Sequence, residues 1–122
     1  MLRTVQVGEK DLNLLANAAT PIRYKMVFGE DLMVAFNQIN SEKRDTGEIL
    51  DITSQLAYIM NCQAEYDKKA LSQISKESYI EWLEDFGSMD FVNASEQIIN
   101  TYLGTTGTSS SPKKGEGRAN GK

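Results

Sequence analysis

Residues 20–36, TPIRYKMVFGEDLMVAF, form the stretch from which the rest of the chain is best understood. Thr20 can cap a helix through its hydroxyl, and Pro21 suits the first helical position because its missing N–H would have no partner there. Gly29 is a natural left-handed helix end. The pattern predicts one short helix over residues 21–28 and a corner at the glycine.

A second helix is predicted after that glycine. Glu30 and Asp31 place negative charge at its start, where unpaired N–H groups and the helix dipole favour an anion. Two short helices at a glycine corner also have the length of a helix-turn-helix, but the two acids would meet the DNA, which argues against binding there. The predicted apolar stripe of this helix is Leu32, Met33, Ala35, Phe36 and Ile39.

The segment before this stretch is predicted to be a β-hairpin. Residues 3–7 and 12–14 alternate with a period of two, and residues 8–11, GEKD, are turn-like. The alternative is a helix over residues 12–19, because leucine and alanine are good helix formers. A lone hairpin is marginal in water, so its apolar face should pack on the helices. That face would consist of Val5, Val7, Leu12 and Leu14.

Downstream, a polar loop over residues 40–48 precedes the predicted central helix, residues 51–65. Asp51 is placed as its cap or first-turn charge. Residues 66–75 fit either a frayed helix or a loop. The apolar residues that recur at helical spacing in the central helix are Ile52, Leu56, Ile59, Met60 and Cys62.

Two more helices complete the predicted domain. Ser75 starts a helix over residues 76–86, and Ser88 or Asp90 caps a last helix that stops at Gly104. The predicted fold is α+β and mostly α, with an N-terminal hairpin on about five helices, in a single domain over residues 1–104. Residues 105–122 contain no apolar side chain larger than alanine, which predicts a disordered basic tail.

Composition excludes several function classes. The chain has 122 residues, no histidine and one cysteine, Cys62, so the Ser-His-Asp, Cys-His and usual zinc sites are missing. Cys62 is expected to be a small buried hydrophobe rather than a nucleophile. No apolar run approaches the roughly 20 residues of a membrane helix, and the first residues do not resemble a secretory signal. We therefore expect a cytoplasmic protein without catalytic activity or cofactor.

The charge is divided unevenly along the chain. The net charge is −4, but residues 105–122 carry +3, so residues 1–104 carry −7. An acidic body repels nucleic acid over most of its surface and suits basic or apolar protein partners.

The acidic residues of the 76–86 helix are the first candidate site. Glu81, Glu84 and Asp85 could bind a cation or act as acid and base, but clustered carboxylates usually form a solvated helix face. A more plausible use is an acidic rim around Trp82 and Phe86 for a partner that carries Lys or Arg.

Two smaller observations accompany this site. Arg23 and Lys25 could touch a phosphate, although such residues more often pair with nearby acids such as Glu30 or Asp31. Four methionines could form an adaptable groove for helical partners or be ordinary core filler. They are Met26, Met33, Met60 and Met89.

Several short motifs occur in one order over nearly the whole chain. A hairpin-like start is followed by an A-T-P-x-R-Y-x-x-x-F-G-x-D-L block, an acidic E-W-L-x-x-F segment and a Ser/Thr-Pro-Lys-Lys end. The matching residues are Ala19, Thr20, Pro21, Arg23, Tyr24, Phe28, Gly29, Asp31, Leu32, Glu81, Trp82, Leu83, Phe86, Ser111, Pro112, Lys113 and Lys114. In this order the motifs resemble the tail assembly chaperones of long-tailed bacteriophages that infect Gram-positive bacteria.

The resemblance implies a function. Members of this family bind the tape measure protein before assembly, keep its hydrophobic helices from aggregating and help recruit tail tube subunits; they are generally absent from the virion. Helix-in-groove binding would need an apolar surface, and self-association is also possible. The expected partner-binding residues are Tyr24, Phe28, Trp82 and Phe86, with Glu81 and Asp85 as rim charges.

The family also implies a use for the tail. Many such chaperones have a longer form made by a translational frameshift, whose extension contacts the tube protein, and Lys113 and Lys114 could mark the slippery site. Eight residues follow Lys114, so this end could equally be a plain terminus. The alternative functions are a small structural head-tail or tail virion protein and, less in keeping with the acidic body, a DNA-binding regulator.

Overall fold

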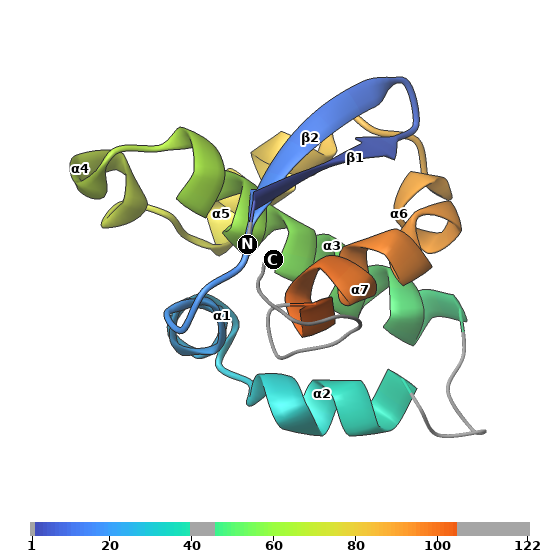
Figure 1. Cartoon of the computed structure of the whole chain (residues 1–122), viewed down its shortest axis with the longest axis horizontal. Helices are drawn as coiled ribbons and strands as arrows, with labels where there is room; N and C mark the ends of the chain where they lie inside the picture. Colours follow the sequence, from blue (N-terminus) through green and yellow to red (C-terminus); the bar gives the residue numbers. More distant parts are fainter. Residues whose placement is uncertain (1, 40–45, 105–122) are drawn as a thin grey trace, which may run out of the picture.

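The computed structural model describes residues 2–39 and 46–104 (Figure 1). A two-stranded hairpin is followed by seven helices in this part of the chain, so the predicted mostly helical α+β fold is confirmed. The elements are β1 Leu2–Val7, β2 Lys10–Leu15, α1 Thr20–Phe28, α2 Leu32–Ile39, α3 Thr46–Glu65, α4 Lys68–Leu71, α5 Lys76–Leu83, α6 Asp90–Asn93 and α7 Ser95–Leu103.

The hairpin is antiparallel and has a two-residue turn. Val5 lies opposite Leu12, and Val7 lies opposite Lys10. The predicted apolar face is confirmed, since its four side chains are all buried. The helical alternative for residues 12–19 is wrong, because residues 12–15 belong to β2 and the next helix begins at Thr20. Gly8 has a φ of 62°, a left-handed conformation that glycine adopts without steric cost. The period of two therefore identified both the strands and their buried side.

The corner at Gly29 forms as predicted, but the cap of α1 differs from the prediction. Gly29 has a φ of 74°, and its N–H donates to Lys25 O at 2.8 Å. The cap of α1 is Ala19 without a side-chain bond, whereas the Thr20 hydroxyl accepts from Asn17 N at 3.0 Å. The predicted Thr20 cap is wrong because this hydroxyl holds the approach to the helix instead.

Helix α2 begins at an acid, as its sequence suggests. Asp31 Oδ1 accepts from Met33 N at 2.8 Å and so acts as the cap. Leu32 and Phe36 of the predicted stripe are buried, but Met33 is exposed because it points about 100° away from Leu32. The side chain of Ile39 lies outside the described part.

Helix α3 is the central element, as predicted, and the hairpin and five other helices pack around it (Figure 1). It begins at Thr46, so the predicted start at residue 51 and the role of Asp51 as a cap are wrong. Ile49 and Leu50 extend the apolar stripe by one more turn and are half-buried, which explains the earlier start. Residues 40–45 of the predicted loop lie outside the described residues.

Helix α4 lies within residues 66–75, which the sequence left open between a frayed helix and a loop, and α5 follows it. Asp67 caps α4 by accepting from Ala70 N at 2.8 Å, and α4 projects from the rest of the molecule (Figure 1). Ser75 starts α5 through a capping box with Ser78, which confirms the predicted start. The helix ends at Leu83 rather than at residue 86.

The last predicted helix is in fact two helices. It breaks at Ala94, whose φ of −97° and ψ of 3° are not helical. Neither Ser88 nor Asp90 caps α6; Asp90 instead accepts from Gly87 N at 2.8 Å. No glycine or proline marks the break, which is why the sequence did not reveal it.

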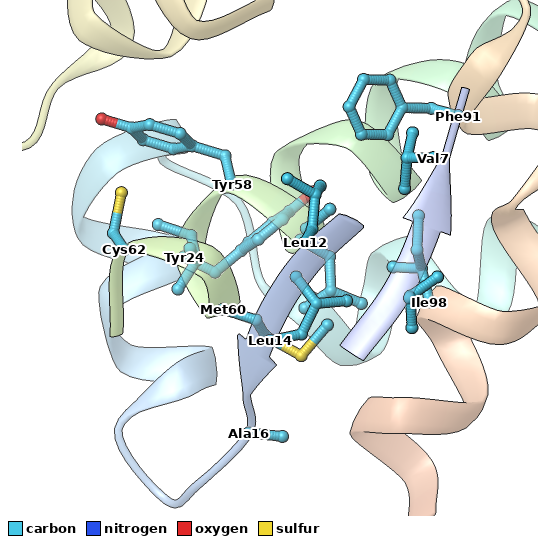
Figure 2. Packing of buried hydrophobic residues seen from close by; sticks show 14 of the residues in the cluster. Val7, Leu12, Leu14, Ala16, Tyr24, Tyr58, Met60, Cys62, Phe91 and Ile98 are labelled. Atoms are coloured by element: carbon cyan, nitrogen blue, oxygen red, sulfur yellow. The ribbon is translucent and has the colours of Figure 1, made fainter. Parts of the chain in front are cut away.

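The core lies between the hairpin, α3 and the C-terminal helices. Figure 2 shows Val7 of β1 beside Phe91 of α6, and Leu14 of β2 beside Met60 of α3; Leu12 and Ile98 belong to the same cluster. Cys62 is buried, as predicted. None of the helices in the described ranges combines the length and apolarity of a membrane span.

Candidate functional site

The four aromatic residues predicted to bind a partner belong to one row of rings inside the fold. Tyr24 contacts Phe28, with ring centroids 5.3 Å apart, and Phe28 contacts Tyr79 at 5.0 Å. The row continues through Tyr58 of α3, which lies 5.3 Å from Trp82. We call it the aromatic row; its members are Tyr24, Phe28, Tyr58, Tyr79, Trp82, Phe86 and Phe91.

Tyr24 lies at one end of the aromatic row and is fully buried. Its side chain has no exposed surface, and its hydroxyl donates to Gln55 Oε1 of α3 at 2.7 Å. Burial raises its pKa well above the ordinary value. A side chain without exposed surface cannot contact a partner, so Tyr24 is removed from the candidate surface. Phe28 is half-buried and packs edge-on against Tyr79.

Trp82 and Phe86 are half-buried and packed mainly against the core. Trp82 Nε1 donates to Asn61 Oδ1 of α3 at 3.2 Å, and its ring lies 5.0 Å from that of Phe86. Both rings also contact buried Phe91. Most of the apolar surface of these two side chains is therefore already used within the chain.

The predicted rim charges are exposed, but they do not border an open aromatic patch. Glu81 of α5 and Asp85, which follows that helix, are exposed. Asp85 and Phe86 also line a hollow of about 610 Å³ beneath the hairpin turn, together with Glu9, Lys10 and Asp90 among others. In the described ranges, no group of three or more His, Cys, Asp or Glu side chains could hold a metal ion.

A more apolar surface lies on the face of α1 opposite Tyr24 and Phe28. A groove of about 520 Å³ separates α1 from α4 and the turn that follows it. Ile22 and Met26 project into solvent there, 62% and 80% exposed, and Leu71 and Ile74 face them half-buried. We call this the α1–α4 groove; it is lined by Ala19, Ile22, Arg23, Met26, Val27, Lys68, Leu71, Ser72 and Ile74.

The groove is basic although the body of the chain is acidic. Arg23 and Lys68 are among its lining residues, and no carboxylate is. Arg23 Nη1 donates to Gln63 Oε1 at 2.8 Å, so the expected pairing of Arg23 with Glu30 or Asp31 is wrong. Gln63 in turn donates to Leu15 O at 2.7 Å, which ties α1, α3 and the hairpin together. The wall formed by α1 is thus firmly held.

The sequence reasoning missed most of this groove, although one signal was available. Ile22 and Met26 are four residues apart, as are Tyr24 and Phe28, so each pair shares a face of α1. Two residues along a helix correspond to a rotation of about 200°, which places the two pairs on opposite faces. Of the four methionines, Met60 is core filler, while Met26, Met33 and Met89 are exposed.

Cys62 has none of the properties of a reactive thiol. It is fully buried, and desolvation raises its pKa to about 11. The thiolate is the nucleophilic form, so the neutral thiol favoured here is unreactive near neutral pH.

Comparison with models of protein families, with curated proteins and with solved structures finds no match to this chain. The function must therefore be argued from the chain itself.

Proposed function

We propose that this chain is a tail assembly chaperone that binds the tape measure protein of a long-tailed bacteriophage and keeps it soluble. The proposal is for a binding role without catalysis, in the host cytoplasm, by a protein absent from the mature virion. It rests on the ordered motifs that resemble this family.

The observation in the structure that best supports a binding role is the α1–α4 groove. A chaperone for hydrophobic helices needs apolar surface that is uncovered before the partner arrives. Ile22 and Met26 provide such surface, whereas the aromatic row is largely covered. We therefore assign tape measure binding to the α1–α4 groove rather than to the aromatic residues predicted from the sequence.

Co-expression with the tape measure protein tests this assignment. The variant Ile22→Ser/Met26→Ser removes the exposed apolar side chains, and Met33→Ser is a matched control because Met33 is also exposed but lies outside the groove. We expect the tape measure protein to co-purify with the wild type and the control, and to aggregate with the double variant.

A third variant, Glu81→Lys/Asp85→Lys, tests the surface predicted from the sequence. We expect it to leave co-purification unchanged. If it abolishes co-purification while the groove variant does not, the binding surface lies on α5 instead. Aggregation of the tape measure protein even with the folded wild type would overturn the chaperone role, and detection of the chain in purified virions would favour a structural virion protein.

The proposal extends to the tail tube protein, through a longer frameshifted form. Lys113 and Lys114, the suggested slippery site, lie outside the described residues. Mass spectrometry of the chain expressed from its natural gene should show a second, longer product. A coding sequence without a run of identical bases at residues 112–115 and without an overlapping downstream frame would exclude it.

A further inference from the structure

The apolar walls of the α1–α4 groove are arranged for aliphatic side chains. Ile22 and Met26 form one wall at i, i+4 spacing, and Leu71 and Ile74 form the other. The lining contains no aromatic residue that would offer a stacking surface. The volume of about 520 Å³ leaves room for several aliphatic side chains of a partner.

The charged residues that line the groove have one sign, although Asp67 caps α4 directly before Lys68. Helix α1 carries Arg23 and Lys25 without an acid, and α4 carries Lys68 and Lys69 without an acid. Residues 1–104 as a whole have a net charge of −7, so these two walls are an exception on an acidic surface. Lys68 is exposed, and among the described residues it has no carboxylate partner.

We propose that the α1–α4 groove binds an amphipathic helix of a partner protein whose aliphatic side chains are bordered by carboxylates. This inference rests on the proposed function, because the tape measure protein would supply the helix. Opposite charges across an interface favour encounter and register, and like charges oppose them. The sequence had suggested the reverse, a basic partner for an acidic rim.

A helix fits this groove better than an extended segment. Both walls include helices, and no strand of the described chain lines the groove. An extended peptide would need a strand edge for its backbone groups, whereas a helix satisfies its own hydrogen bonds. The partner therefore has to supply only side chains.

The chain's own C-terminal segment does not match this chemistry. Residues 105–122 carry +3 and have no aliphatic side chain larger than alanine. They would be repelled by Arg23 and Lys68 and would fill none of the apolar surface.

Two synthetic helical peptides provide the test. Both carry leucines at i, i+4 and i+7 on one face; one has glutamates beside them and the other has lysines at the same positions. Fluorescence anisotropy should show that the full chain binds the glutamate peptide at least about ten-fold more tightly, and that added salt reduces this preference. Equal binding, tighter binding of the lysine peptide, or binding of neither would overturn the proposal.

Charge variants test whether the preference for the glutamate peptide arises in the groove. Lys68→Glu should remove most of the preference for the glutamate peptide. Lys76→Glu, which makes the same change at an exposed site of α5 outside the groove, should keep it. Circular dichroism melts check that both variants fold. If both lose the preference equally, the effect comes from net charge and the proposal fails.

Two measurements distinguish this inference from self-association and from the proposed function. Sedimentation of the chain alone should show an oligomeric state that Met26→Ser does not change. If the chain self-associates and Met26→Ser dissociates it, a second copy of the chain occupies the groove and the proposal is overturned. If the tape measure protein co-purifies but the peptides show no charge preference, the proposed function stands and this inference fails. If the peptides show a clear charge preference but the tape measure protein does not co-purify, this inference stands and the proposed function fails.

Discussion

One short helix, α1, contributes to two surfaces that differ in how far their neighbours cover them. On one side, Tyr24 and Phe28 enter the aromatic row and are covered by α3 and α5; on the other, Ile22 and Met26 remain uncovered in the α1–α4 groove. The helix has little difference in hydrophobicity around its circumference, so the pattern alone does not say which side is inside. What separates the two sides is the neighbour that each one meets.

The large aromatic side chains of α1 do not coincide with its uncovered surface. Aromatic residues bury the most apolar area, so they are the first to be drawn into a core when a neighbour is available. Smaller exposed aliphatic residues are less conspicuous in the sequence but leave more surface for a partner here. The predictions below test this division, from the largest expected effect to the smallest.

The largest effect should come from truncating the aromatic row. Trp82→Ala removes contacts with Tyr58, Phe86 and Phe91 and should lower the free energy of unfolding by about 3 kcal/mol, measured by urea denaturation. An unchanged free energy together with lost tape measure binding would return Trp82 to the partner surface and break the comparison.

Alkaline pH should destabilise the fold, in part through the tyrosines of the aromatic row. Burial raises the pKa of Tyr58 from 10.0 to about 12 and raises that of Tyr79 as well. A raised pKa means that the unfolded state loses its proton first, so this stabilisation is complete below pH 10 and is lost as the pH rises through the native values. The urea midpoint should therefore fall between about pH 10 and about pH 12.

The Met26→Ser variant provides the control for this pH series. Its urea midpoint should fall in parallel with that of the wild type, since residue 26 is not in the row. A midpoint that stays constant up to about pH 12 would show that the tyrosine hydroxyls ionise without unfolding and would contradict the burial of the row.

Two glycines allow the free-energy cost of backbone strain alone to be compared with that of strain plus a steric clash. Gly8→Ala and Gly29→Ala both place a side chain on a left-handed residue, but only at position 8 would the new Cβ collide with the Asp90 carboxylate. We expect losses of about 2 and about 1 kcal/mol respectively. Thermal denaturation of both variants measures the difference; equal losses would mean that Asp90 moves aside freely.

The smallest effect on stability should come from the groove. Met26→Ser should change the free energy of unfolding by less than about 0.5 kcal/mol, because the side chain is 80% exposed, while weakening tape measure binding. A destabilisation comparable to that of Trp82→Ala would show that Met26 contributes to the core and that the groove is not free surface.

Much of the local structure could be predicted from the sequence. The alternation in residues 3–7 located the hairpin and its buried side, Gly29 located the corner, and Ser75 located the start of α5. The earlier start of α3 and the break at Ala94 were missed, because packing rather than a local signal sets them. Of the predicted partner-binding residues, only Glu81 and Asp85 are fully at the surface.

The sequence by itself determined the elements, the acidic body with its basic end, and the residue types available for chemistry. These follow from periodicity, capping and composition, which act within a few residues of each other. Only the tertiary structure decided which apolar faces were covered. Residues 19–27 and 68–74 are far apart in the chain, and the groove between them exists because α3 fixes α1 while α4 projects beside it.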